Sequence, residues 1–230
     1  MKKHYSFLIS FLLLFSFQLQ QSQTTLLDQD FESVSTGALG ESSASPPYQV
    51  DLSSGCSDDG WIVSTSDSQY MNCVDCSGKR ATITYETCYQ DYLIYTDSFT
   101  PSKSEIAVSF AYDYRYWSSG DSFKVTLFNK TTFSTAATLV DITDSSVENT
   151  YSNSSISVTP GNEYRLTFRY QGNDGYGAVV DNILVTQEGP NISVGSAITG
   201  LDYVSGSGPN TDNTPEIISY GGSRYIEPAE

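Results

Sequence analysis

Acidic side chains lie at both ends of the patterned part of the chain. Asp28, Asp30 and Glu32 alternate along the run DQDFE, so a strand there would present all three on one face. Near the other end, Asp181 and Asn182 interrupt the apolar run VVDNILV. Because an unpaired acid is costly to bury, and the first and last strands of a sandwich are commonly neighbours, we expect the two clusters to share a partner. Calcium, which takes roughly six to eight oxygen ligands, fits that role.

The first acidic cluster also allows a second chemistry. A retaining glycosidase needs two carboxyl groups about 5–5.5 Å apart and an inverting one about 6.5–9.5 Å, which neighbouring positions on one strand face could supply. The catalytic strand of such an enzyme normally lies mid-domain in a tryptophan-lined cleft, whereas this strand is the first and the chain has two tryptophans. We therefore favour a non-catalytic module. A glycoside-active enzyme using Asp28, Asp30 and Glu32 is one alternative, and a purely structural spacer is another.

The composition excludes several classes of function. The chain is acidic, with 11 Lys and Arg against 27 Asp and Glu and a formal net charge of −16, so it lacks the basic surface that nucleic acid requires. Its one histidine is His4, inside the export segment assigned below, so the rest of the chain cannot hold a Ser-His-Asp triad or a histidine-containing zinc site. The acidity also disfavours polyanionic ligands and leaves neutral glycans or cell-surface proteins as partners.

The N-terminus has the pattern of an export signal. Lys2 and Lys3 precede the apolar run FLISFLLLFSF at residues 7–17, which is shorter than the ~20 residues that span a bilayer. We assign residues 1–23 to a signal peptide. The first cysteine is Cys56, too far along the chain to carry a lipid at the cleavage site. We expect a secreted protein, extracellular or held at a cell surface, with no membrane insertion.

Alternating patterns predict strands throughout the next part of the chain. In residues 105–117, Ile106, Val108, Phe110, Tyr112, Tyr114 and Tyr116 share one face. In residues 163–172, Tyr164, Leu166, Phe168 and Tyr170 do the same. Shorter strands are expected around Trp61, at Ala81–Ile83–Tyr85, at Leu93–Tyr95–Phe99, at Phe123–Val125–Leu127 and over residues 178–185. Turn signals rich in Gly, Asn, Asp and Pro separate them, and no convincing helical period occurs.

This pattern predicts an all-β fold, an antiparallel β-sandwich of jelly-roll type, either concanavalin-like or galactose-binding-like. We place the domain at residues 24–189. Residues 190–230 are rich in Gly, Ser and Asn, and are interpreted as a tail or as the start of a truncated second β-module. Within them, residues 192–203 hold enough apolar side chains for a strand.

Export makes disulfide bonds plausible for Cys56, Cys73, Cys76 and Cys88. Four cysteines allow three pairings, and zinc is a competing reading of the CVDC spacing. If residues 61–65 and 80–85 form a hairpin, Cys56 and Cys88 lie at its open end and Cys73 and Cys76 in its connecting loop. Since a disulfide needs Cα atoms within roughly 4.4–6.8 Å, this geometry favours Cys56 with Cys88 and Cys73 with Cys76.

Aromatic side chains at strand ends are the candidate ligand contacts. Sugars stack their C–H faces on aromatic rings while polar groups fix their hydroxyls. Trp117 and Tyr116 end one long strand, and Asn173, Asp174 and Tyr176 lie in another loop. We expect these five residues to bind ligand, and Trp61, Tyr112 and Tyr114 to be core.

The order of the motifs resembles a known family. Asp30-Phe31-Glu32, Gly60-Trp61, the runs YLIYTDSF, VSF and RLTFRY, and GYG leading into Asp181-Asn182-Ile183 are similar to MAM-like and cleaved-adhesin-type (choice-of-anchor) jelly-roll domains of secreted bacterial surface proteins, and to carbohydrate-binding jelly rolls. The resemblance covers about residues 26–187. It implies a structural calcium shared by Glu32 and Asp181, with Asp30 beside them. It also implies a non-catalytic adhesion or carbohydrate-binding module, belonging or attached to a larger surface assembly.

Overall fold

The computed structural model describes residues 23–41, 44–53, 59–67, 70–83 and 86–189, together with the backbone of 216–220 and 223–227. The chain divides into two compact units, residues 1–191 and 192–230, and each is described by itself. The predicted signal peptide, Cys56 and the predicted strand over 192–203 lie outside the described residues. The described part of the chain contains no helix long and apolar enough to span a membrane.

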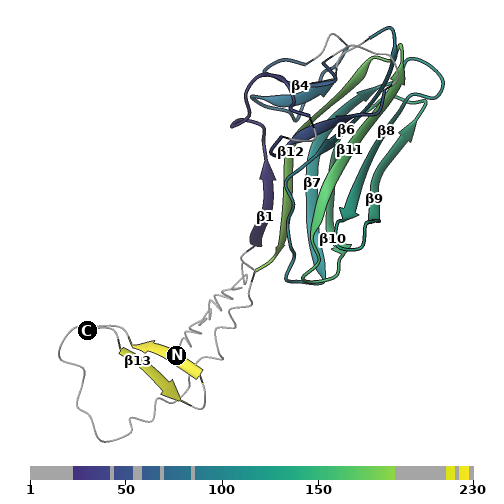
Figure 1. The fold of residues 1–230 in the computed structure, drawn as a ribbon. Helices are drawn as coiled ribbons and strands as arrows, with labels where there is room; N and C mark the ends of the chain where they lie inside the picture. The colour runs from purple at the N-terminus through teal and green to yellow at the C-terminus, as the bar shows by residue number, and fades with distance from the viewer. Residues whose placement is uncertain are drawn as a thin grey trace, which may run out of the picture. The chain divides into compact units, whose positions relative to one another are not determined.

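The first unit is an antiparallel β-sandwich, as predicted (Figure 1). One sheet has seven strands in the order β10-β7-β12-β5-β4-β2, with β1 also pairing with β12. Its strands are β1 Gln23–Gln29, β2 Gly37–Ala38, β4 Trp61–Ser64, β5 Arg80–Ile83, β7 Glu105–Arg115, β10 Val147–Ser157 and β12 Gly177–Glu188. The other sheet has five strands in the order β3-β6-β11-β8-β9. These are β3 Tyr48–Asp51, β6 Tyr89–Tyr95, β8 Ser122–Asn129, β9 Ser134–Thr143 and β11 Tyr164–Asn173.

The two long alternating strands build the core between the sheets. The inward side chains of β7, from Ile106 to Tyr114, are each at most 5% exposed, and those of β11, from Tyr164 to Tyr170, at most 1%. Phe110 meets Phe168 edge to face across the sheets, with ring centroids 5.2 Å apart. Trp61 is fully buried, and β4 and β5 pair as the predicted hairpin, Trp61 opposite Ile83. The core predictions for Trp61, Tyr112 and Tyr114 are confirmed.

Several strand predictions were incomplete or wrong. In β6 the inward residues are Tyr92 and Ile94, whereas the prediction grouped Leu93 and Tyr95, which are half-buried on the outer face. Strands β9 and β10 were missed because they lie at sheet edges, where most of their side chains are exposed and no apolar alternation marks them.

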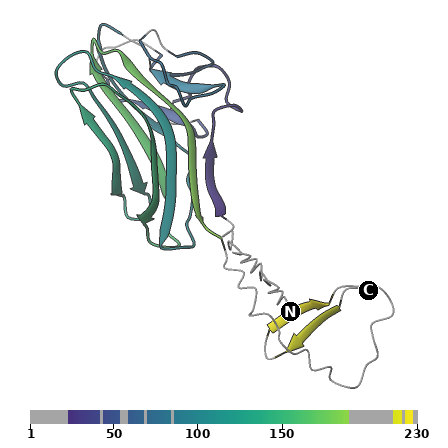
Figure 2. The same cartoon turned by 180° about the vertical axis from the view of Figure 1, so that it is seen from behind.

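The chain enters and leaves the sandwich side by side. Figures 1 and 2 show β1 running along the lower half of β12, and the register joins Gln23 to Glu188 and Gln29 to Ile183. The second unit contains one described hairpin, β13 Glu216–Tyr220 with β14 Ser223–Glu227, which the sequence patterns did not indicate.

Candidate functional site

Three aromatic side chains lie in a row, which we call the aromatic ridge: Tyr70, Tyr176 and Trp117. Tyr70 and Trp117 are exposed, and Tyr176 between them is half-buried. The ring of Tyr176 lies between the other two, 4.2 Å from the centroid of Tyr70 and 4.9 Å from that of Trp117. Trp117 is 52% exposed and Tyr70 43%. Trp117 follows β7 and Tyr176 precedes β12, so both stand at the same end of neighbouring strands.

Asp121 fixes the two loops that carry the ridge. Its carboxylate is 1% exposed and accepts backbone N–H bonds from Trp117, Ser118 and Asn173 at 2.9–3.2 Å. The Ser118 hydroxyl donates to the carbonyl of Asn173 at 2.7 Å. Because the buried carboxylate satisfies backbone groups of both loops, it sets the position of Trp117 relative to the β11–β12 loop.

Two glycines let that loop close over the core. A Cβ at Gly172 would lie 2.2 Å from the hydroxyl oxygen of Tyr170, and one at Gly175 would lie 2.4 Å from it. The ring of Tyr170 is fully buried, so its hydroxyl has no room to retreat. Gly172 and Gly175 therefore bring the backbone down onto Tyr170, directly before the half-buried Tyr176.

The structure brings together two of the five predicted ligand contacts, Trp117 and Tyr176. Tyr116 is half-buried and packs against the core. The side chain of Asn173 is exposed while its backbone bonds to Asp121, and Asp174 is half-buried at a φ of 63°. Tyr70 was missed, because its place beside Tyr176 depends on how residues 70–79 cross the sheet and no local pattern encodes that path.

Residues 70–79, which we call the cysteine loop, cover the outer face of the seven-stranded sheet. Met71 and Cys73 form a small buried cluster with Ala111 of β7 and Val179 of β12. Carboxylates then accept the backbone N–H groups of the loop in sequence: Asp113 from Asn72, Glu148 from Val74, Asp181 from Ser77 and Glu32 from Lys79, at 2.7–2.9 Å. The loop that presents Tyr70 is therefore held down by four acids from four parts of the chain.

Cys73 and Cys76 are joined by a disulfide with Cα atoms 5.3 Å apart, the inner bond that the hairpin geometry favoured. Cys88 is also disulfide-bonded. The outer pairing of Cys56 with Cys88 stays a prediction, because Cys56 lies outside the described residues.

The opening acidic motif is not one strand face, which corrects the prediction. β1 ends at Gln29, and the buried Phe31 adopts a φ of 60°, which turns the chain. Asp30 accepts the N–H of Glu32 at 3.0 Å, and Glu32 turns to the cysteine loop. Asp28 stays on the strand, opposite Leu184. The three acids therefore do not lie on one strand face, and the bend at Phe31 removes the geometry on which the glycosidase alternative was based.

Glu32 and Asp181, from the two ends of the domain, lie near each other beneath the cysteine loop, as expected. Asp181 is fully buried, accepts N–H bonds from Ser77 and Asn182 at 2.9 and 2.8 Å, and feels the negative charge of Glu32. The Lys79 ammonium binds the carbonyls of Glu32 and Val34, both at 2.9 Å. Among the described residues, no three acidic, cysteine or histidine side chains are grouped to hold one metal ion. Asp30 thus does not complete a three-carboxylate site, and calcium here stays a prediction.

Burial changes the titration of two acids beneath the cysteine loop. It raises the pKa of Asp181 to about 6, although the N–H groups of Ser77 and Asn182 and the charge of Arg80 oppose the rise. Burial likewise raises the pKa of Asp113, against the Asn72 N–H and the Arg115 guanidinium, whose Nε lies 2.8 Å from the carboxylate.

The outer face of the five-stranded sheet carries a second polar arrangement, which sequence patterns did not single out. Arg169 of β11 binds both oxygens of Asp91 of β6, at 2.8 and 2.7 Å. The guanidinium of Arg165 lies 3.6 Å from the ring centroid of Tyr95 and donates to the hydroxyl of Tyr48 at 3.1 Å. These groups satisfy one another across neighbouring strands.

Comparison with known proteins places the fold. No family model matches the chain, and no curated protein matches it. The carbohydrate-binding module TmCBM61, solved in complex with β-1,4-galactotriose, is similar at 11% identity and a TM-score of 0.51, over 72% of this chain and 99% of that one. Two cleaved adhesin domains of Lys-gingipain from Porphyromonas gingivalis W83, K1 and K3, align at 12% identity with TM-scores of 0.45 and 0.44. They cover 72% and 71% of this chain and 99% and 100% of their own. The resemblance expected from the motifs is therefore one of fold: the chain is an antiparallel jelly-roll sandwich like that of TmCBM61.

Proposed function

We propose that this chain is a secreted, non-catalytic binding module that holds a neutral glycan against the aromatic ridge. The observation that carries the proposal is a row of three aromatic rings in contact, in which Trp117 and Tyr70 are exposed on either side of the half-buried Tyr176. A large apolar surface in water costs free energy unless a partner covers it. Pyranose rings offer C–H faces that fit such a surface.

The polar surroundings of the ridge support a neutral ligand. The Asn173 side chain is exposed in the loop that leads to Tyr176, and an amide can donate to and accept from sugar hydroxyls. With a net charge of −16, the chain repels polyanions. Export, expected from the N-terminal segment, would bring the module to glycans or cell-surface proteins outside the cell.

The enzymatic alternative loses its geometric basis, because the bend at Phe31 separates Asp28 from Glu32, whose carboxylate instead accepts a backbone N–H. The spacer alternative predicts that no glycan binds at all. The likeness to TmCBM61, whose structure holds a galactotriose, favours glycan binding as the first hypothesis to test.

A glycan array followed by calorimetry on the best ligand tests the proposal. Trp117→Ala should weaken binding at least tenfold, since truncating an aromatic anchor typically costs about 2 kcal/mol or more. Phe133→Ala is the matched control: Phe133 is 84% exposed, in the β8–β9 turn at the opposite end of β8 from the ridge, and its loss should leave binding unchanged.

Three results would contradict the proposal. One is the absence of any bound glycan across the array, which would favour the spacer. Another is full affinity in Trp117→Ala. The third is release of reducing ends from a bound glycan that Glu32→Gln abolishes, which would establish the enzyme.

A further inference from the structure

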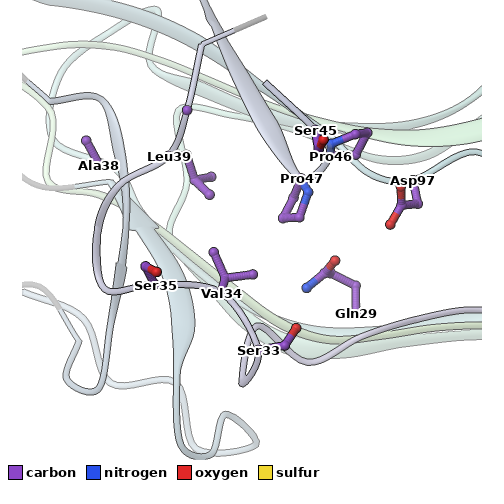
Figure 3. A pocket seen from close by; sticks show the side chains of 11 residues that line it. Gln29, Ser33, Val34, Ser35, Ala38, Leu39, Ser45, Pro46, Pro47 and Asp97 are labelled. Atoms are coloured by element: carbon purple, nitrogen blue, oxygen red, sulfur yellow. The ribbon is translucent and has the colours of Figure 1, made fainter. Parts of the chain in front are cut away.

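A cavity lies apart from the aromatic ridge, beside the end of β1. A cavity of about 410 Å³ lies between the end of β1, the segment from Ser33 to Gly40, the prolines that precede β3, and Asp97 after β6 (Figure 3). It shares no residue with the aromatic ridge, and its volume falls in the range of small-molecule sites.

A glutamine occupies a position in this cavity where the strand pattern calls for an apolar residue. In β1 the buried positions alternate, Leu27 and then Gln29, so the Gln29 side chain points inward. Gln29 is 7% exposed, and the described part of the chain offers its side-chain amide no hydrogen-bond partner. Figure 3 shows the amide directed into the cavity, toward Val34 and Pro47. An amide that faces an open cavity and makes no hydrogen bond to the described residues is free to donate to and accept from a bound ligand.

The walls of the cavity are held in place by the fold. The side chain of Gln49 donates to the carbonyl of Leu39 at 3.0 Å, and its backbone N–H donates to that of Gly40 at 2.8 Å. Thr96 donates its hydroxyl to the carbonyl of Asp97 at 2.9 Å. Because hydrogen bonds within the chain hold these walls in place, we expect binding to require little reorganisation of them.

The lining selects the class of ligand. Leu39, Val34 and the two prolines provide apolar contact, while serine hydroxyls and the Gln29 amide can both donate and accept. Asp97 adds an acceptor, and no lysine or arginine lines the cavity, so an anion would find no counter-charge. A compact neutral ring with several hydroxyls on one side and C–H groups on the other meets all of these conditions.

We infer that this cavity binds a single neutral monosaccharide unit, oriented by Gln29 and Asp97 with its C–H face against the proline wall. The inference does not depend on the aromatic ridge. A monosaccharide has about a dozen non-hydrogen atoms, so we expect a Kd on the order of a millimolar.

The test is a protein-observed NMR titration of the full chain with D-galactose, D-glucose, D-mannose and L-arabinose, each alone. At least one sugar should shift the Gln29 side-chain amide and the backbone amides of Leu39 and Asp97, and the shifts should saturate. Gln29→Leu, which keeps the size and removes the amide, should weaken this binding at least tenfold. Ala38→Phe, at an exposed lining position, should block it without touching Gln29.

Trp117→Ala should leave the cavity titration unchanged, so failure of the ridge proposal and failure of this one give different results. Saturable shifts of the cavity amides that Gln29→Leu and Ala38→Phe both remove would support the inference. It is overturned if no sugar shifts those amides, or if Gln29→Leu binds as well as the parent chain. Binding of methylguanidinium in place of every sugar would also overturn it and would identify a site for a basic side chain.

Discussion

The outer faces of the two sheets handle charge in different ways. On the seven-stranded sheet the cysteine loop covers Asp113 and Asp181, both 0% exposed, and backbone N–H groups of that loop are among their partners. On the five-stranded sheet the Lys124–Asp141 pair spans β8 and β9 in the open, with side chains 42% and 53% exposed. Asp113 and Asp181 lose their hydration in order to hold a loop, whereas the Lys124–Asp141 pair stays solvated. The Arg169–Asp91 pair of the five-stranded sheet lies between these two cases, with Asp91 only 5% exposed.

The difference shows how a surface loop becomes part of a fold. The cysteine loop has few apolar anchors, Met71 and Cys73, so its position depends on acids that accept its N–H groups. Exposed pairs such as Lys124–Asp141 add little stability because solvent screens them. Loss of an acid on the covered face should therefore cost far more than loss of one on the open face.

The largest expected effect comes from Asp113→Ala. It leaves the Asn72 N–H and the Arg115 guanidinium without their buried acceptor and should lower the free energy of unfolding by about 3–5 kcal/mol. Asp141→Ala, the matched change on the open face, should cost less than ~1 kcal/mol. Urea denaturation of both variants measures the contrast, and equal costs would remove the distinction between the faces.

Acid should stabilise the covered face through Asp181. Its pKa is raised in the native state from the ordinary value of 3.8 to about 6, so the native state binds the proton more tightly than the unfolded chain. The stabilisation is fully present below the unfolded pKa and is lost as pH rises through about 6. At roughly 1.4 kcal/mol per pKa unit it amounts to at most about 3 kcal/mol.

Asp181→Asn removes this titration. The unfolding free energy of the parent chain minus that of the variant should therefore decrease as the pH rises from 4 to 7. Chemical denaturation across that range in the presence of a chelator measures it. A difference that rises with pH would show that Asp181 is stabilised as a carboxylate instead.

The disulfide should contribute less. Cys73 and Cys76 are three residues apart, and closing so short a loop stabilises by roughly 2 kcal/mol on the chain-entropy model. The double change to alanine should lower the melting temperature and alter Trp117 fluorescence, because Tyr70 of the same loop packs against Tyr176 beside Trp117. Val74→Ala, at a 71% exposed position in the loop, is the control that should change neither.

Calcium gives the smallest expected effect. If it binds at Glu32 and Asp181, an ion at ten times its Kd stabilises the native state by about 1.4 kcal/mol, and a chelator should lower the melting temperature accordingly. Protons would compete with the ion at Asp181, so with calcium present acidification from pH 7 should lose this gain. A melting temperature that chelation leaves unchanged would assign both acids to the cysteine loop alone.

The sequence predicted the parts of the fold in which local pattern and burial agree. The apolar faces of β7 and β11 could be identified in advance, because six and four alternating side chains leave one way to bury them. Burial of the opposite face of β7 could not be predicted, since Ala111 and Asp113 are covered by a loop some forty residues earlier in the chain. Edge strand β10 gave no signal, because most of its side chains face water.

The candidate site divides in the same way. Trp117 and Tyr176 were found because each stands beside turn residues at a strand end. Tyr70 could not be predicted, because its position beside Tyr176 depends on the path of the cysteine loop across the sheet. The acidic opening was misjudged because alternation was carried through Phe31, whose positive φ breaks the strand. Gln29 was overlooked, although its place two residues after Leu27 marks it as an inward position.

The side-by-side pairing of β1 and β12 has a mechanical consequence. Gln23 lies opposite Glu188, so a load pulling these two ends apart meets the ladder's hydrogen bonds one pair at a time, as in a zipper, and never in shear. The first residues of β1, Gln23 to Thr25, are exposed and add little packing to resist it. Under tension β1 should peel away before β7 and β11 yield, each released residue adding about 3.3 Å of length. A module of this kind would extend by a short step under load and keep the aromatic ridge, which stands at the far end of β12, intact.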